Sequence, residues 1–276
     1  MKIAVIARCK NEIQNLQEWL DNKKFSDLFF ITDNESTDGS FEFLSNQKNV
    51  IVKSVKGFDE GRDFQILLNL ARTNKVDWVF KFDCDEFVGE DFASQLNYII
   101  NKTDYDCIRL RKISKHFKAS NDKGVLTREY FHGGVYGTRL TSKIDISDRR
   151  IHVGSFCFYK KSIVISSLVT HFWVRSKEDA IERARIYSLV DKTKNYKIKD
   201  EVPKDILVDL EVAANSQKFK KFNNYGVPFL VQTDRGYDLV KPKLNQSFLK
   251  QELKHIIWLI LSWFGLLKYY LNFVRK

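Results

Sequence analysis

The chain has 276 residues, of which 43% are hydrophobic and 29% are charged, so it can bury one large α/β core or two small ones and is not globally disordered. Its formal net charge of +11 favours anionic partners, namely nucleotide phosphates, nucleic acid or an anionic membrane surface, without choosing among them. Four cysteines lie far apart without a CxxC pair, which argues against a zinc site or a disulfide framework and favours a reducing compartment: Cys9, Cys84, Cys107 and Cys157.

Short apolar runs alternate with helical patterns through the first half of the chain. The predicted strands cover 2–7, 28–32, 49–55 and 76–82, and the predicted helices between them are centred on 13–20, 41–44 and 64–71. The first apolar run is too short for a signal peptide. This rhythm with short loops predicts an α/β fold with a mostly parallel sheet and right-handed crossovers.

The second half of the chain is less regular. A helix is predicted at 92–100, strands at 107–112 and 162–172, and an amphipathic helix at 178–190. The basic, glycine-containing stretch 114–150 has no clear pattern, and such a segment is suited to an acceptor pocket.

Acidic residues follow the predicted strand 76–82 directly. Alternation along the chain puts Asp83 and Asp85 on the same side, where two carboxylates can share a divalent cation that also binds phosphates. An isolated Asp-x-Asp is more often a solvated turn. Here the loops after the other three strands, at 8–12, 33–39 and 57–62, are also polar or charged, and a parallel sheet brings all four loops to one edge.

The ordered motifs resemble one known family. They are Lys10-Asn11-Glu12, Glu18-Trp19-Leu20, the run from Asp33 to Gly39, Asp83-Cys84-Asp85-Glu86-Phe87 and the run from His171 to Ser176. Over roughly residues 1–190 the chain resembles the family 2-type, GT-A-fold glycosyltransferases, in the branch with KNE…EWL…DN.STDG…DxDEF…HY..RS motifs. The resemblance implies a hexosyltransferase-type enzyme that takes a sugar from a nucleotide-sugar donor, with UDP as the default nucleotide.

The resemblance also implies roles for individual residues. The nucleotide-sugar-binding set would be Arg8, Glu12, Asp33, Glu35, Arg62, Asp83 and Arg175. The metal set, for Mn²⁺ or Mg²⁺, would be Asp83, Asp85 and His171. Three of these keep an alternative: Arg62 and Arg175 as surface residues and His171 as a structural histidine.

The implied reaction is direct displacement at the anomeric carbon, with inversion as the family's usual outcome. Metal and basic residues stabilise the leaving diphosphate, and a carboxylate deprotonates the acceptor hydroxyl. The candidate catalytic residues are Asp85, Glu86 and Asp148. The sequence does not identify the base, for which Glu86, Asp145 and Asp148 all stay open. Two other functions stay open: a nucleotidyltransferase, although the loop 8–12 has no glycine, and a basic nucleic-acid-binding protein, although no basic-aromatic motif is present. We expect no nucleic-acid partner.

The C-terminal segment has an apolar run at 256–267 flanked by basic and aromatic residues. The run is shorter than the roughly 20 residues that span a bilayer, so we expect a helix lying on the inner membrane face of a cytoplasmic enzyme. A helix packed on protein and a true span are the alternatives. The expected organisation is a GT-A domain at 1–200, a peripheral extension at 201–249 and this helix at 250–276, acting on a cell-surface polysaccharide or lipid-linked glycan.

Overall fold

The computed structural model describes residues 1–117, 126–146, 156, 159–174, 229–233 and 236–240. The predicted helix at 178–190 and the C-terminal segment 250–276 lie outside these residues. None of the described helices is long and apolar enough to cross a membrane.

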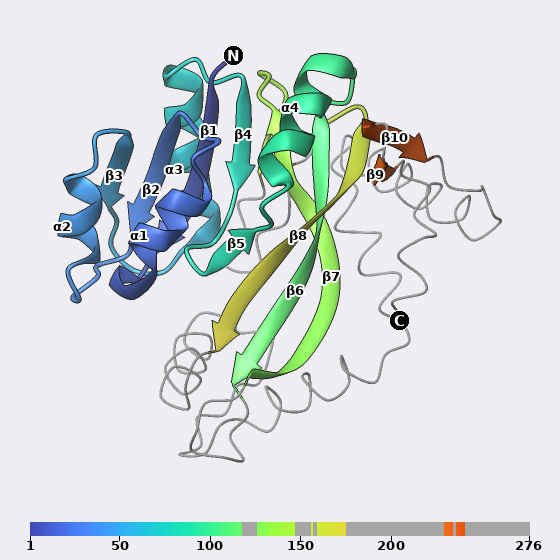
Figure 1. Ribbon diagram of the computed structural model, residues 1–276. Helices are drawn as coiled ribbons and strands as arrows, with labels where there is room; N and C mark the ends of the chain where they lie inside the picture. The colour runs from blue at the N-terminus through green and yellow to red at the C-terminus, as the bar shows by residue number, and fades with distance from the viewer. Residues whose placement is uncertain (118–125, 147–155, 157–158, 175–228, 234–235, 241–276) are drawn as a thin grey trace, which may run out of the picture.

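One mixed sheet organises the described chain (Figure 1). Its strands are β1 (Ile3–Cys9), β2 (Leu28–Asp33), β3 (Val50–Ser54), β4 (Trp78–Lys81), β5 (Glu86–Val88), β6 (Cys107–Phe117), β7 (Leu126–Arg139), β8 (Ser162–Val174), β9 (Phe229–Thr233) and β10 (Gly236–Val240). Its helices are α1 (Ile13–Asn22), α2 (Ser40–Ser45), α3 (Glu60–Thr73) and α4 (Phe92–Lys102).

The strand order is β10-β9-β8-β6-β7-β4-β1-β2-β3, with β5 paired to β8. Strands β4, β1, β2 and β3 run parallel, which confirms the predicted α/β fold with its mostly parallel sheet. Strand β7 joins β4 antiparallel, and β6 then pairs antiparallel with β7 and parallel with β8. The long β6, β7 and β8 project past the lower edge of the sheet, where β1, β2 and β4 end (Figure 1).

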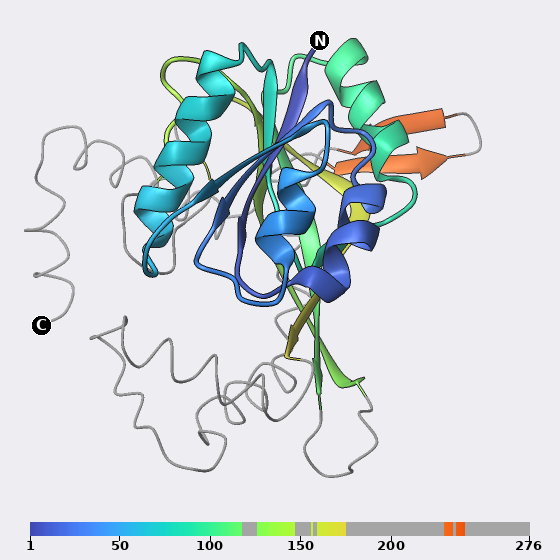
Figure 2. The same ribbon diagram turned by 90° about the vertical axis from the view of Figure 1, so that its left-hand side faces the viewer.

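Helices cover both faces of the parallel half (Figure 2). Helix α3 packs on one face, and α1, α2 and α4 pack on the other. Alternation divides each strand between the two cores: in β4, Trp78 and Phe80 face the α1 side together with Phe82, whereas Val79 faces α3. The rings of Phe80 and Phe82 stack with 6.2 Å between centroids, which stiffens the chain just before the acidic loop.

The largest difference from the sequence-based expectation is at 114–150, where no element was assigned. Strand β6 continues to Phe117, and β7 forms a long antiparallel partner for it. Strand β7 contains Gly133, Gly134 and Gly137, so it lacks the alternation that identifies a strand in a sequence. Strands β9 and β10 add a hairpin beside β8, within the stretch expected to be peripheral.

Candidate metal and nucleotide site

The acidic loop lies where β4 leaves the sheet. The backbone closes a turn there, because the amide of Glu86 donates to the carbonyl of Asp83 over 3.0 Å. Strand β5 then pairs with β8 so that Glu86 lies opposite His171, and the amide of Phe172 donates to the carbonyl of Asp85. Strand pairing thus brings His171 to the acidic loop, although it lies 86 positions after Asp85 in the chain.

The side chains of Asp83, Asp85 and His171 converge. Their ligand atoms all lie within 4.8 Å of one another, and the His171 Nε2 is 3.3 Å from the Asp85 Oδ1. Two ligands that share one Mg²⁺ or Mn²⁺ ion at right angles lie roughly 3 Å apart. Asp85 and His171 are 3% and 8% exposed, so water supplies little alternative solvation. The donor set of two carboxylates and one imidazole therefore fits a divalent cation.

The charges around the three groups agree with this fit. Burial raises the pKa of Asp83, and the nearby carboxylates of Glu86 and Asp85 raise it further. Burial alone would lower the pKa of His171, but the carboxylate of Asp85 outweighs it and the pKa is raised. A divalent cation among these groups would relieve the repulsion between the carboxylates.

Glu86, predicted as a catalytic residue, is held by three donors. Its Oε1 accepts from the Lys112 Nζ over 2.8 Å and from the Tyr136 hydroxyl over 3.1 Å, and its Oε2 accepts from the Asp83 amide. Burial alone would raise the pKa of Glu86, but Lys112 and His171 outweigh it and hold that pKa below its ordinary value. A carboxylate with these partners is a weak base.

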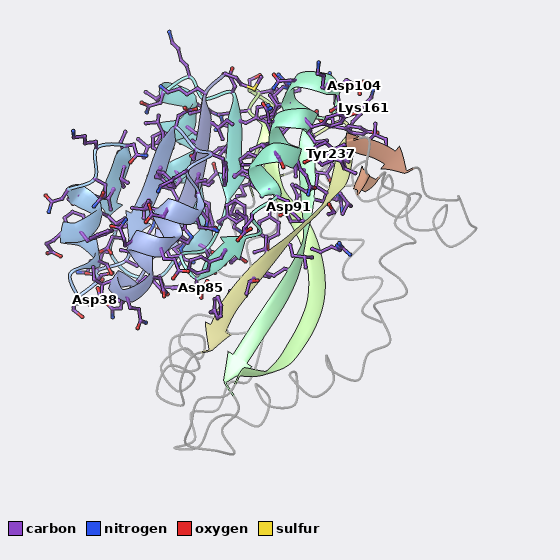
Figure 3. The ribbon with its side chains drawn as sticks, in the orientation of Figure 1. Asp38, Asp85, Asp91, Asp104, Lys161 and Tyr237 are labelled. Carbon is purple, nitrogen blue, oxygen red and sulfur yellow. The ribbon has the colours of Figure 1, made fainter. Side chains whose placement is uncertain are left out.

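The two loops that follow β1 and β2 are tied together by side chains. The Asn11 amide donates to the Ser36 hydroxyl, and the Asn11 side-chain oxygen accepts from the Thr37 amide. The amide of Ile13 donates to Asp38, which lies on the same lower edge of the sheet as Asp85 (Figure 3). These hydrogen bonds join the two loops into a rigid rim along this edge of the sheet. The polar residues of the motifs at 10–12 and 33–39 therefore have a structural role in the loops.

Behind this rim, buried acceptor atoms at the end of β2 accept hydrogen bonds from none of the described residues. Asp33 is 2% exposed, and its Oδ2 accepts from the Ser36 amide, whereas its Oδ1 accepts from no residue that the structure describes. The Thr32 Oγ1 and the Asn34 Oδ1 are also buried and have no hydrogen-bond partner among the described residues. A buried carboxylate oxygen without a donor is costly, so this position is suited to a ligand that carries an N–H or O–H group.

A fully buried carboxylate organises the basic residues of this edge. Asp63 accepts from the Arg8 Nε over 3.2 Å, from the Arg62 Nε over 2.9 Å and from the Asn34 Nδ2 over 2.9 Å. Arg62 also donates to the carbonyls of Lys56 and Gly57, so most of its N–H groups are already used within the protein. Arg8 pairs with Glu60 and lies over the ring of Phe58 at 4.2 Å.

The remaining predicted residues lie as follows. The Glu12 carboxylate accepts from Asn15, and the Glu35 carboxylate accepts from the Gly57 amide, so both belong to the loops of this edge. Asp145 accepts from Gln65. Asp148 and Arg175 lie outside the described residues. The sequence analysis did not single out four residues that lie around the site, namely Lys23, Asp63, Lys112 and Tyr136. Their positions depend on which helices and strands pack together, which the sequence does not show.

Known structures resemble this fold at low identity. A crystal structure of S. aureus TarS 1–349 aligns over 89% of this chain and 97% of that chain, at 12% identity and a TM-score of 0.40. TarS 1–349 in complex with UDP-GlcNAc aligns at 20% identity and a TM-score of 0.34. This alignment covers 46% of this chain and only 37% of that chain. CMP:2-keto-3-deoxy-manno-octonic acid synthetase complexed with CTP aligns over 50% of this chain and 74% of that chain, at 9% identity and a TM-score of 0.33.

No family model matches the chain, and no curated protein matches it significantly. Every one of these TM-scores is below 0.5 and every identity is below 25%. A functional assignment therefore depends on the geometry of the site itself.

Proposed function

We propose that this protein is a metal-dependent glycosyltransferase that takes a sugar from a nucleotide-sugar donor, with UDP as the expected nucleotide. The observation that carries the proposal is the convergence of Asp83, Asp85 and His171 at the carboxyl edge of a parallel sheet. The buried Asp33 Oδ1, at the end of β2 on the same edge, accepts from no residue in the described part of the chain, and this supports it further. This combination suits a ligand with a diphosphate at one end and a hydrogen-bonding base at the other.

The residues take the following roles in this proposal. Asp85 and His171 hold a divalent cation together with Asp83, and that cation, when bound, offsets negative charge on the leaving diphosphate. Asp33 accepts an N–H of the nucleobase. Arg8, whose Nε is fixed by Asp63, faces the nucleotide with its remaining N–H groups, while Glu12 and Glu35 shape the loops around it.

Glu86 takes a positioning role in this proposal in place of the catalytic role expected from the sequence. Its lowered pKa and three donors disfavour proton abstraction, and its Oε2 supports the backbone of Asp83. The role of the catalytic base is then taken by a carboxylate such as that of Asp148. Arg175 helps to neutralise the departing diphosphate. The same proposal includes inversion at the anomeric carbon and a polysaccharide or lipid-linked acceptor. It also includes the three-part domain organisation and the attachment of 250–276 to the inner membrane face.

Donor hydrolysis provides the test, because it requires no acceptor. The purified protein is incubated with Mn²⁺ and UDP-glucose, UDP-galactose or UDP-N-acetylglucosamine, and the release of UDP is measured. Slow release by the wild type, lost in Asp85→Asn and retained in Asp104→Asn, would support the proposal. Asp104 is the matched control because it lies far from Asp85, near the upper end of α4 (Figure 3).

A parallel reaction separates the competing enzyme class. The same protein is given UTP or CTP with sugar 1-phosphates, and the release of pyrophosphate is measured. Pyrophosphate release without any hydrolysis of nucleotide-sugars would contradict the proposal and identify a nucleotidyltransferase.

A further inference from the structure

Lys23 is a fully buried lysine directly behind the acidic loop. It follows the last residue of α1, and its side chain is 0% exposed. Its neighbour Lys24 lies in the solvent, with a side chain that is 77% exposed and paired with Asp21. Lysine is almost never fully buried without a partner, because removing an ammonium group from water is costly. The position of Lys23 therefore calls for an explanation.

The surroundings of the Lys23 ammonium are specific. Its Nζ donates to the carbonyl of Glu86 over 2.6 Å and to the Asn22 side-chain oxygen over 3.2 Å. Aromatic faces enclose the rest of it, with Nζ 4.7 Å from the ring centroid of Trp19 and 5.2 Å from those of Phe82 and Phe87. Cation–π attraction offsets part of the lost hydration. The Glu86 carbonyl, to which Nζ donates, belongs to the turn carrying the proposed metal ligands.

The same face of α1 holds the acidic loop at two more points. The Trp19 Nε1 donates to the carbonyl of Asp83 over 2.8 Å, and Asn22 exchanges two hydrogen bonds with the backbone of Val88. Residues 19, 22 and 23 are spaced as neighbours on one helix face. Three consecutive contacts therefore fix the backbone from Asp83 to Val88, and Lys23 supplies the one in the middle.

Stability alone does not account for a lysine here. A methionine has a similar length, fills the same space and packs well against aromatic rings, without the cost of burying a charge. Burial lowers the pKa of Lys23 to about 7, although Glu86, Cys84 and Asp85 oppose this shift, so the ammonium is held at a cost to the fold. What the lysine adds is a hydrogen bond from Nζ to one chosen carbonyl, which the amino group can donate in its charged and in its neutral form.

We propose that Lys23 is a positioning residue of the metal site: its amino group donates to the Glu86 carbonyl and so holds Asp83 and Asp85 in the geometry that binds the cation. This inference rests on the proposed function, since it concerns the same metal ligands. It adds a residue from the opposite side of the loop, one that touches neither metal nor substrate.

The test measures Mn²⁺ affinity directly, by the loss of the free Mn²⁺ signal in electron paramagnetic resonance titrations. The proteins are the wild type, Lys23→Met, Lys23→Gln and the matched control Lys24→Met. We expect Lys23→Met to stay folded with a similar unfolding temperature, because the buried charge that it removes offsets the donor that the Glu86 carbonyl loses, yet to bind Mn²⁺ at least tenfold more weakly. A merely structural role would not lower affinity while preserving stability. Lys24→Met should match the wild type in both properties.

The outcomes separate the two proposals. A folded Lys23→Met that binds Mn²⁺ within twofold of the wild type would overturn the role of Lys23 and leave the metal site intact. If Lys23→Met and Lys23→Gln both fail to fold while Lys24→Met folds, the lysine serves the whole fold and the positioning role is wrong. A wild type that binds no Mn²⁺ would overturn the metal assignment itself, and the role of Lys23 with it.

Discussion

Replacing Lys112 with methionine should destabilise the protein strongly, because it leaves the buried carboxylate of Glu86 without its cation. Lys112 is largely buried, and its Nζ lies 2.8 Å from the Glu86 Oε1. At that distance, the Coulomb attraction at an effective dielectric constant of about 20 is about 6 kcal/mol, part of which offsets the loss of hydration of both ions. Removing one member of such a pair costs about 3–5 kcal/mol.

Urea unfolding at pH 7.5 or so, followed by circular dichroism, measures this cost in Lys112→Met, Glu86→Gln and the double variant. The double variant should be more stable than Lys112→Met, because no charge is left unpaired. The difference between wild type and Lys112→Met should shrink as the pH falls through 4.5, the ordinary pKa of a glutamate. The lowered pKa of Glu86 stabilises the wild type above that pH, and the stabilisation is lost as the carboxylate becomes protonated.

A loss below about 1 kcal/mol in Lys112→Met would refute this reasoning, since a surface ion pair contributes that much. Glu86 would then be free to exchange partners, and its expected role as a catalytic base would regain support.

Three further predictions concern the same edge of the sheet. The Lys23 pKa of about 7 lies below the ordinary 10.5, so the unfolded chain binds more protons than the folded one between these pH values. The free energy of unfolding of the wild type should therefore rise with pH in this range, by up to about 1.4 kcal/mol per pH unit relative to Lys23→Met. If urea unfolding gave the two proteins the same pH dependence of this free energy, the prediction would be wrong. Asp63→Leu leaves Arg8 and Arg62 without their shared carboxylate and should cost about 3–5 kcal/mol in thermal unfolding, and a cost below about 1 kcal/mol would show that Asp63 does not organise them. His171→Ala should weaken Mn²⁺ binding by about tenfold or more in calorimetric titration, and unchanged binding would remove His171 from the ligand set.

The parallel half of the fold was predictable because its signals are local. Strand β4 is an apolar run that ends in carboxylates, and the loops after β1 and β2 carry turn-forming residues. Strand alternation predicted that Asp83 and Asp85 lie on the same side; they do lie together, but on a turn that follows β4, which the Glu86 amide closes onto the Asp83 carbonyl. His171 was expected only by resemblance, and the pairing of β5 with β8 brings it to Asp85.

The charged network behind the site could not be predicted, because it depends on register and burial. In the sequence Lys23 and Lys24 are equivalent neighbours, and only packing separates the buried one from the solvated one. Lys112 contacts Glu86 through the placement of β6 beside β8, and Tyr136 reaches it from a strand whose glycines concealed its period. Glu86 was expected among the candidates for the catalytic base, and its three donors favour the positioning role that we propose for it.

Calorimetric titration of UDP, with and without Mn²⁺, tests the central claim most directly. The account predicts that UDP binds the wild type only when Mn²⁺ is present and that Asp85→Asn loses this binding while keeping its fold. Binding of equal strength with and without Mn²⁺, or no binding of UDP under either condition, would contradict the assignment of Asp83, Asp85 and His171 to a metal site for a nucleotide-sugar.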